Sequence, residues 1–155
     1  MKLVDAIRDE MIVLDADYKS REELFKDFSE RFYKSGVVEN AEAFVDALLE
    51  RESVCSTFCS MNIAIPHGIS ETVKTPSIGF CRLKNPIDWD GDNETPVKFI
   101  FMIAMPKREY TGEENEHIKL LSKIAILSLE DNVQENWNSF KTIKEFKDYL
   151  NDSDK

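Results

Sequence analysis

One histidine of this chain lies in a setting that suits a nucleophile. A short apolar run, Ile63 to Ile65, leads into the tripeptide Pro66-His67-Gly68. Proline fixes its own φ and has no backbone N–H, whereas glycine has no Cβ and lets other atoms come close. The pattern predicts a stiffly held imidazole at the edge of a short strand, where reactive chemistry is favoured over core packing.

An imidazole in such a place can carry a phosphoryl group. Its ordinary pKa near 6.5 leaves it largely neutral at pH 7, so one ring nitrogen can attack while a hydrogen bond at the other fixes the tautomer. No metal-bound intermediate is needed for this step, and we expect neither a metal nor a cofactor. The alternative is a histidine with a purely structural role, which is the commoner case for an arbitrary histidine.

Two further residues are candidates to assist His67. Arg51 falls at the end of a predicted helix, and its planar guanidinium can form paired hydrogen bonds to phosphate oxygens. His117 falls in the first turn of a later helix, where unpaired N–H groups and the helix dipole favour an anion. Each has a plainer explanation: Arg51 as the neighbour of Glu50 and Glu52 on a solvated helix end, and His117 as an exposed histidine.

Two helices are predicted before His67. The capping box Ser20-Arg21-Glu22-Glu23 opens the first and Gly36 ends it, with an apolar face made of Leu24, Phe25, Phe28 and Phe32. Asn40 is the expected N-cap of the second, whose buried face is expected to contain Phe44, Val45, Leu48 and Leu49. Arg51 at its C-terminal end can then reach whatever lies beyond the helix.

Strands are predicted at 11–14, 63–65, 77–83 and 97–105. The last of these shows no alternation of apolar and polar residues, so both of its faces are expected to be covered, as in a sheet between helices. The turn-rich segment Asp90-Gly91-Asp92-Asn93 connects the last two strands. An α/β layered architecture follows.

The rest of the chain is predicted to be helical. A helix runs from about 113 to 129, and two shorter ones lie near 133–140 and 143–150. The residues expected to face inward from the long helix are Ile118, Leu121, Ile124, Ala125 and Leu129. The 155 residues fit one domain, which we expect to span 1–155, and no linker or repeat interrupts it.

Composition excludes several classes of protein. The net charge of −10 and the scattered lysines and arginines argue against nucleic-acid binding, because phosphate backbones would be repelled. The longest apolar stretch is far shorter than the roughly 20 residues that span a bilayer, and the first residues lack a signal-peptide core. The three cysteines have no disulfide-framework spacing. We expect a soluble, cytoplasmic protein with reduced thiols.

Three segments in consistent order carry a resemblance to a family. They are Leu49-Glu50-Arg51-Glu52, the string IAIPHG around His67, and the segment from Asn115 to Leu121. Together they resemble enzyme IIA of the fructose/mannitol class of the bacterial phosphoenolpyruvate-dependent sugar phosphotransferase system. The likeness runs from about Met11 to Leu150. It implies a single-domain mixed β-sheet sandwiched between helices and a phosphotransferase that forms a phosphohistidine.

The resemblance also implies roles and partners. His67 would receive the phosphoryl group on Nε2 from phospho-HPr and pass it to a cysteine of enzyme IIB, which serves the membrane component enzyme IIC. By the same resemblance, His117 would orient the phosphorylated ring, Arg51 would lie near it, and Thr57 would donate a hydroxyl hydrogen bond near the phosphate. Both protein partners would dock on one exposed patch, with Phe58 and Met61 as possible apolar contributors. The substrate sugar is expected to be fructose or a related one.

Other functions stay open. One is a nitrogen-type regulatory enzyme IIA, in which the phosphorylation state of His67 controls protein binding. Another is a zinc site made of Cys55, Cys59 and the two histidines, although their spacing is unlike that of structural zinc fingers. A Cys/His hydrolase has no local motif in its support. One departure from the family is that Phe58-Cys59-Ser60-Met61-Asn62 replaces glycines, which puts backbone phosphate contacts there in doubt.

Overall fold

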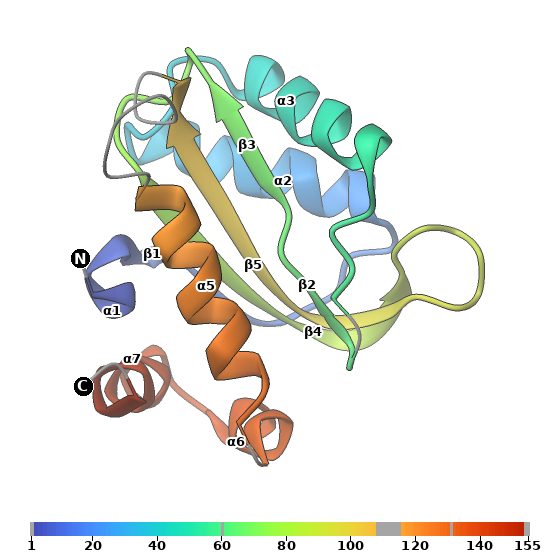
Figure 1. Cartoon of the computed structure of the whole chain (residues 1–155), viewed down its shortest axis with the longest axis vertical. Helices are drawn as coiled ribbons and strands as arrows, with labels where there is room; N and C mark the ends of the chain where they lie inside the picture. The colour runs from blue at the N-terminus through green and yellow to red at the C-terminus, as the bar shows by residue number, and fades with distance from the viewer. Residues whose placement is uncertain (1, 60, 108–115, 131, 154–155) are drawn as a thin grey trace.

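The computed structural model describes residues 2–59, 61–107, 116–130 and 132–153, with the side chains of 116–118 and 153 excepted. In this part of the chain five strands form one sheet in the order β1-β4-β5-β2, and β3 also pairs with β5 (Figure 1). The strands are β1 (Ile7–Ala16), β2 (Ile63–Ala64), β3 (His67–Ser70), β4 (Ser77–Asp88) and β5 (Pro96–Pro106). β4 and β5 are antiparallel, and the other pairs are parallel, so the sheet is mixed.

Helices cover both faces of this sheet. The described helices are α1 (Leu3–Ala6), α2 (Arg21–Lys34), α3 (Ala41–Val54), α5 (Glu116–Ser128), α6 (Val133–Ser139) and α7 (Ile143–Ser153). Figure 1 shows α2 and α3 on one side of the sheet and α5 on the other, with α1 and α7 near each other. The predicted α/β class, with a mixed sheet between helices, is confirmed.

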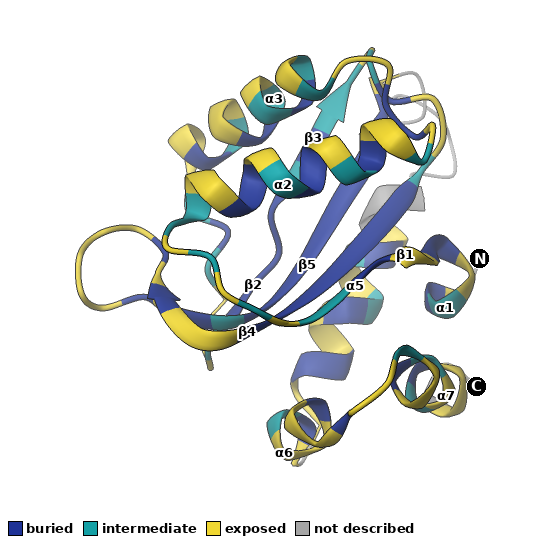
Figure 2. Ribbon diagram, turned by 180° about the vertical axis from the view of Figure 1, so that it is seen from behind, coloured by how far each residue is buried: buried dark blue, intermediate teal, exposed yellow. Residues whose placement is uncertain are grey.

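The core consists of two apolar layers that meet in the sheet. One layer joins Phe99, Phe101 and Ile103 of β5 to α1, α5, α6 and α7, and the other joins Ile100 and Met102 to α2 and α3. Successive residues of β5 therefore serve opposite layers, as their lack of alternation predicts. β5 is buried from Phe99 to Pro106, and Figure 2 shows most of the strand in the colour of buried residues.

The predicted helix ends are confirmed by their capping contacts. Ser20 accepts from the Glu23 amide at 3.2 Å and Asn40 accepts from the Ala43 amide at 3.0 Å, so each predicted N-cap holds an otherwise unpaired N–H group. Gly36 follows α2 with a φ of +80°, a conformation that favours glycine.

The predicted apolar face of α3 is too wide. Phe44 and Leu48 are buried as expected, but Val45 is only partly buried and Leu49 is 36% exposed. The buried positions of α3 are 44, 48 and 52, a narrow stripe at a spacing of four residues. The third member of this stripe is Glu52, a charged residue.

The predicted inner face of α5 is also partly wrong, although Leu121 packs against the core as expected and the side chain of Ile118 lies outside the described residues. Ile124 is buried, whereas Ala125 is exposed and Leu129 is 77% exposed because it follows the last residue of the helix. Leu120 and Leu127 are buried in their place, which completes a stripe at positions 120, 124 and 127.

The predicted strands are all present, but their ends differ from the prediction. β1 and β4 extend beyond 11–14 and 77–83, and the four-residue helix α1 comes before β1. The strand predicted at 63–65 ends at Ala64, and a second strand starts at His67. No helix in the described residues has the length and apolar character that a membrane span requires.

Candidate active site

His67 lies on the edge strand of the sheet. β2 and β3 pair one after the other with the same side of β5, in registers that match Ile63 to Phe99 and His67 to Ile103. Pro66 lies between them, and its carbonyl accepts from the Ile103 amide at 2.9 Å. The expected strand-edge position is confirmed, with the difference that His67 begins β3 instead of ending the preceding run.

Gly68 lets α3 approach this edge closely. A Cβ at position 68 would lie 2.7 Å from Cε1 of Phe44, nearer than carbon atoms pack. The φ of Gly68 is outside the left-handed region, so the glycine is required for space and not for an unusual backbone conformation. The close packing brings the C-terminal end of α3, with Arg51, next to His67.

Both nitrogens of the His67 ring have a partner. The Ile65 carbonyl oxygen lies 3.1 Å from Nδ1, and the Nε–H of Arg51 donates to Nε2 at 2.9 Å. A carbonyl can only accept and a guanidinium can only donate, so the proton is on Nδ1 and the lone pair on Nε2. The ring is thus neutral, and its Nε2 lone pair accepts from Arg51.

The surroundings keep His67 neutral at physiological pH. Burial lowers the pKa of the imidazole below its ordinary value of 6.5, and the Arg51 charge lowers this pKa further. The Ile65 carbonyl and the Glu52 carboxylate oppose the shift without reversing it. A neutral imidazole is the form that can attack phosphorus.

A hollow of about 330 Å³ opens in front of His67. It is lined by Ala47, Glu50, Arg51, Val54, His67, Ile69 and Lys107. Lys107 is exposed and directly follows β5, the strand that pairs in parallel with β3. Sequence analysis did not identify Lys107 as part of the site. Its position one residue after β5 could have indicated it, because parallel strands end at the same edge of a sheet.

Thr57 is buried, with its hydroxyl directed away from solvent. Both its hydroxyl and its backbone N–H donate to the Glu52 carboxylate. A hydrogen bond from Thr57 to a phosphate stays a prediction, and so does the role of His117. His117 belongs to α5, but its side chain lies outside the described residues.

The segment that replaces the glycines of the family lies in a hairpin whose two sides pair in antiparallel fashion, with a bridge between Phe58 and Ala64. The Ile65 amide donates to the Thr57 carbonyl at 3.0 Å, and the Cys59 amide donates to the Ile63 carbonyl at 2.8 Å. Met61 and Asn62, near its tip, have φ values of 53° and 66°. These values lie in the left-handed region that favours glycine, and here a methionine and an asparagine adopt them.

The two apolar residues expected near His67 differ in exposure. Phe58 is partly buried and packs on the α2–α3 core layer. Met61 is 50% exposed and lines a groove on the Ile65 side together with Ile63, Ala125 and Leu129. The large apolar residues that line the His67 hollow itself are Val54, which is 79% exposed, and Ile69.

Cys59 and Cys81 lack the features of a nucleophile. Cys55 and Cys59 are exposed and Cys81 is buried. Desolvation of the thiol and the nearby Glu52 carboxylate raise the pKa of Cys59, and burial raises that of Cys81, so thiolate formation is disfavoured at both. Among the described residues no three histidine, cysteine or acidic side chains gather in a metal-binding group.

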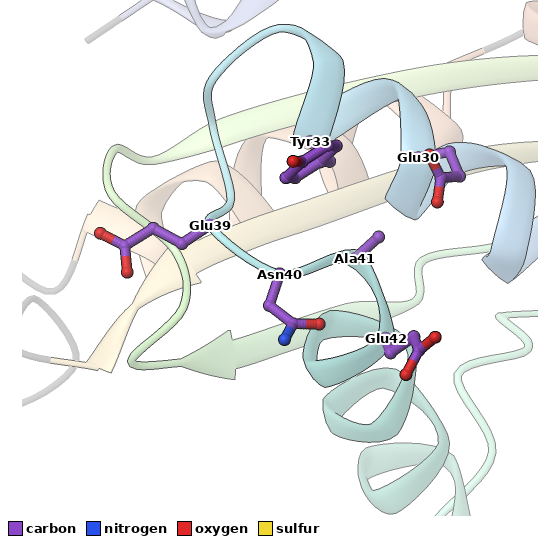
Figure 3. A pocket seen from close by; sticks show the side chains of 6 residues that line it. All are labelled: Glu30, Tyr33, Glu39, Asn40, Ala41 and Glu42. Carbon is purple, nitrogen blue, oxygen red and sulfur yellow. The ribbon is translucent and has the colours of Figure 1, made fainter.

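A second hollow at the other end of α3 has the opposite electrostatic character (Figure 3). It also measures about 330 Å³, but Glu30, Glu39 and Glu42 line it with Tyr33, Asn40 and Ala41. Asn40 and Arg51 are separated by about 16 Å along the helix axis, at 1.5 Å per residue. Carboxylates there would repel a phosphoryl group, so the arginine end of α3 is the candidate site.

Comparison with known proteins agrees with the geometry. The family model "Phosphoenolpyruvate-dependent sugar phosphotransferase system, EIIA 2" matches residues 5–153. The mannitol-specific phosphotransferase enzyme IIA component of Staphylococcus aureus is 34% identical over 147 residues, which cover 92% of this chain and 93% of that protein. The fructose-specific EIIABC component of Bacillus subtilis is 28% identical over 155 residues, all of this chain but 24% of that protein's length.

A solved structure supports the same assignment. The crystal structure of the nitrogen regulatory protein IIA-Ntr from Neisseria meningitidis superimposes with a TM-score of 0.83 at 26% identity. The match covers 96% of this chain and 98% of that one. The resemblance read from the residues is confirmed: the chain belongs to the EIIA 2 family of the phosphoenolpyruvate-dependent sugar phosphotransferase system, a family of phosphotransferases.

Proposed function

We propose that this chain is a phosphocarrier that receives a phosphoryl group on Nε2 of His67 and passes it on during sugar uptake. The observation that supports this most directly is the tautomer: Nδ1 is held by the Ile65 carbonyl and the Nε2 lone pair faces the hollow-lining Arg51. A neutral, oriented lone pair beside a guanidinium is what phosphoryl transfer requires of an acceptor.

The first step transfers the phosphoryl group from an imidazole of phospho-HPr to the imidazole of His67. As Nε2 of His67 bonds to the phosphorus of phospho-HPr, the donor P–N bond breaks and the donor ring keeps the electron pair. The Nδ1 proton of His67 stays on the hydrogen bond to Ile65. In the second step a cysteine thiolate of enzyme IIB attacks the phosphorus, and the electron pair of the P–N bond returns to Nε2.

Arg51 changes partner during these steps. Its Nε–H occupies the lone pair that must attack, while Nη1 donates to the Cys55 carbonyl at 2.6 Å. Once phosphorus bonds to Nε2, the released N–H groups can turn to the phosphoryl oxygens, where charge-assisted hydrogen bonds are strong. Lys107 on the same hollow adds a second positive charge. The His117 imidazole is proposed to orient the phosphorylated ring from the start of α5.

The wider assignment follows the relatives. The sugar is proposed to be fructose or a related one, with mannitol as the alternative named by the Staphylococcus aureus relative. The partners are proposed to be HPr and enzyme IIB, with enzyme IIC served indirectly. We also propose that residues 1–155 act as one domain in the cytoplasm.

A regulatory role is the second candidate, because the IIA-Ntr structure superimposes over nearly the whole chain. In that case the phosphorylation state of His67 would control binding to another protein. Both roles use the same first step and differ in whether an enzyme IIB accepts the phosphoryl group.

The test reconstitutes the transfer from phosphoenolpyruvate, enzyme I and HPr. We expect one acid-labile phosphoryl group per chain, its loss in His67→Ala, and slower onward transfer in His117→Ala. Fructose- and mannitol-type enzyme IIB proteins are then added in turn, and phosphoryl transfer to one of them supports transport. Full labelling of His67→Ala would overturn the proposal, and labelling that no enzyme IIB can remove would favour regulation.

A further inference from the structure

A buried carboxylate lies one residue from Arg51 without facing the hollow. Glu52 is 8% exposed as a residue and 2% exposed in its side chain, although it belongs to the last turns of α3. A carboxylate removed from water is costly unless it is paired and hydrogen-bonded. The position of Glu52 therefore depends on its partners.

The Glu52 carboxylate collects donors from three separate segments. It accepts from the backbone N–H of Thr57 at 3.1 Å, from the Thr57 hydroxyl, and from Nε1 of Trp89 at 3.4 Å. Nη1 of Arg21 lies 3.7 Å from it and 3.3 Å from Asp90. Each of these groups presents a donor to Glu52, so the carboxylate is the common acceptor of Thr57, Trp89 and Arg21.

Two of these contacts continue to the imidazole. The Thr57 residue that donates to Glu52 accepts, through its carbonyl, from the Ile65 amide at 3.0 Å. The Ile65 carbonyl in turn holds Nδ1 of His67 at 3.1 Å. Hydrogen bonds through Thr57 and Ile65 thus connect the Glu52 carboxylate to the proton-bearing nitrogen.

We propose that Glu52 is a positioning residue that fixes the tautomer of His67 through Thr57 and Ile65. Resting on the proposed function, the inference explains how Nε2 is kept as the nucleophile. With the Thr57–Ile65 hairpin held, the Ile65 carbonyl points at Nδ1 and keeps the proton there. Without it, the ring can carry its proton on Nε2, and that tautomer has no lone pair to offer at the reacting atom.

The substitution Glu52→Gln tests this with little change in volume. The amide has one acceptor oxygen, and its NH₂ group would face donors, so it cannot satisfy Thr57, Trp89 and Arg21 together. Thr57→Val is a second, milder variant that removes only the hydroxyl. Thr57→Ser keeps a hydroxyl and should therefore keep the hydrogen bond to Glu52. Asp15→Asn is the matched control, because it makes the same carboxylate-to-amide change beside a buried arginine, Arg82, away from the site.

The readout is the ¹⁵N NMR spectrum of the two histidine rings in the unphosphorylated protein near pH 7.5, assigned with His117→Ala. We expect the Nδ1–H tautomer in the native protein, Asp15→Asn and Thr57→Ser, and a mixture with Nε2–H in Glu52→Gln and Thr57→Val. Phosphoryl acceptance should fall about tenfold in Glu52→Gln, as a misplaced reacting group implies.

The result that overturns the inference is an unchanged Nδ1–H tautomer in both Glu52→Gln and Thr57→Val. If Glu52→Gln does not fold, Thr57→Val decides alone. The tautomer is measured without any phosphoryl donor, so a failure of the proposed transfer leaves this outcome readable. A changed tautomer together with no transfer in the native protein would support the positioning and reject the phosphocarrier.

Discussion

Glu52 and Arg82 are both charged and both buried, but their contacts end in different places. Arg82 of β4, 4% exposed, donates to both carboxylate oxygens of Asp15 at 3.1 Å and to the carbonyls of Trp137 and Phe140 at 2.9 and 2.6 Å. These contacts connect β4 to β1 and to the end of α6. Glu52 instead connects α3 to the Thr57–Ile65 hairpin, and the Ile65 carbonyl of this hairpin contacts the imidazole of His67.

The Arg82 site is expected to affect only the stability of the fold, whereas the Glu52 site is expected to affect both stability and the chemistry of His67. Removing one partner of a buried charge leaves other groups without theirs, so both sites should matter for folding. Only the Glu52 side should also change the protonation of His67, because the Arg82 contacts stop at backbone carbonyls and an exposed carboxylate. Substitutions can therefore disrupt the contacts of one site, and the free energy of unfolding and the His67 tautomer can both be measured in each variant.

The largest effect is expected from Arg82→Met. The change leaves two buried carbonyls without a donor, and we expect a loss of about 3 kcal/mol in the free energy of unfolding, measured in urea. The His67 tautomer in the folded protein should be unchanged. A loss below about 1 kcal/mol would show that the arginine does not tie the two elements together.

The next effect is expected from Arg51→Ala. Phosphoryl acceptance from phospho-HPr should slow about 100-fold, since one charged donor to the developing phosphoryl charge is lost. The free energy of unfolding should change by only about 1 kcal/mol, because Arg51 is partly exposed. Arg31→Ala, which removes an ion pair with Asp27 on α2, is the matched control and should transfer at the native rate.

A smaller effect should appear in the pH dependence of stability. Because the folded pKa of His67 lies below its ordinary value of 6.5, the unfolded chain binds the proton first as the pH falls. The contribution of His67 is therefore complete above pH 6.5 and is lost as the pH falls from there through the lower folded pKa. Urea unfolding at several pH values should show the native protein losing stability relative to His67→Asn over this interval. A constant difference between the two would contradict the lowered pKa.

The smallest effect is expected from Met61→Gly. The positive φ of Met61 costs a non-glycine residue about 1 kcal/mol, and glycine removes this cost while adding entropy to the unfolded chain. We expect a net change within about 1 kcal/mol and an unchanged His67 tautomer. A shifted tautomer would show that the hairpin tip, and not Glu52 alone, positions the ring.

The sequence predicts the parts of this site that depend on local pattern. Caps such as Ser20 and Asn40 act on the following turn, and the strand positions follow from short apolar runs, so both could be read directly. The role of Glu52 could not, because its partners Trp89 and Arg21 come from segments far away in the sequence. The one available signal was a charged residue four positions after Leu48, which itself lies four positions after Phe44. The error at Leu129 arose from extending helical periodicity past the end of α5.

The identity of the phosphorylated atom tests the central claim most directly. The protein is labelled with ¹⁵N, phosphorylated through HPr, and examined for coupling between ³¹P and the imidazole nitrogens. We expect the coupling at Nε2 of His67, with the proton still on Nδ1. Phosphorus on Nδ1, on His117 or on any other residue would contradict the proposal that Ile65 and Arg51 prepare Nε2 as the acceptor.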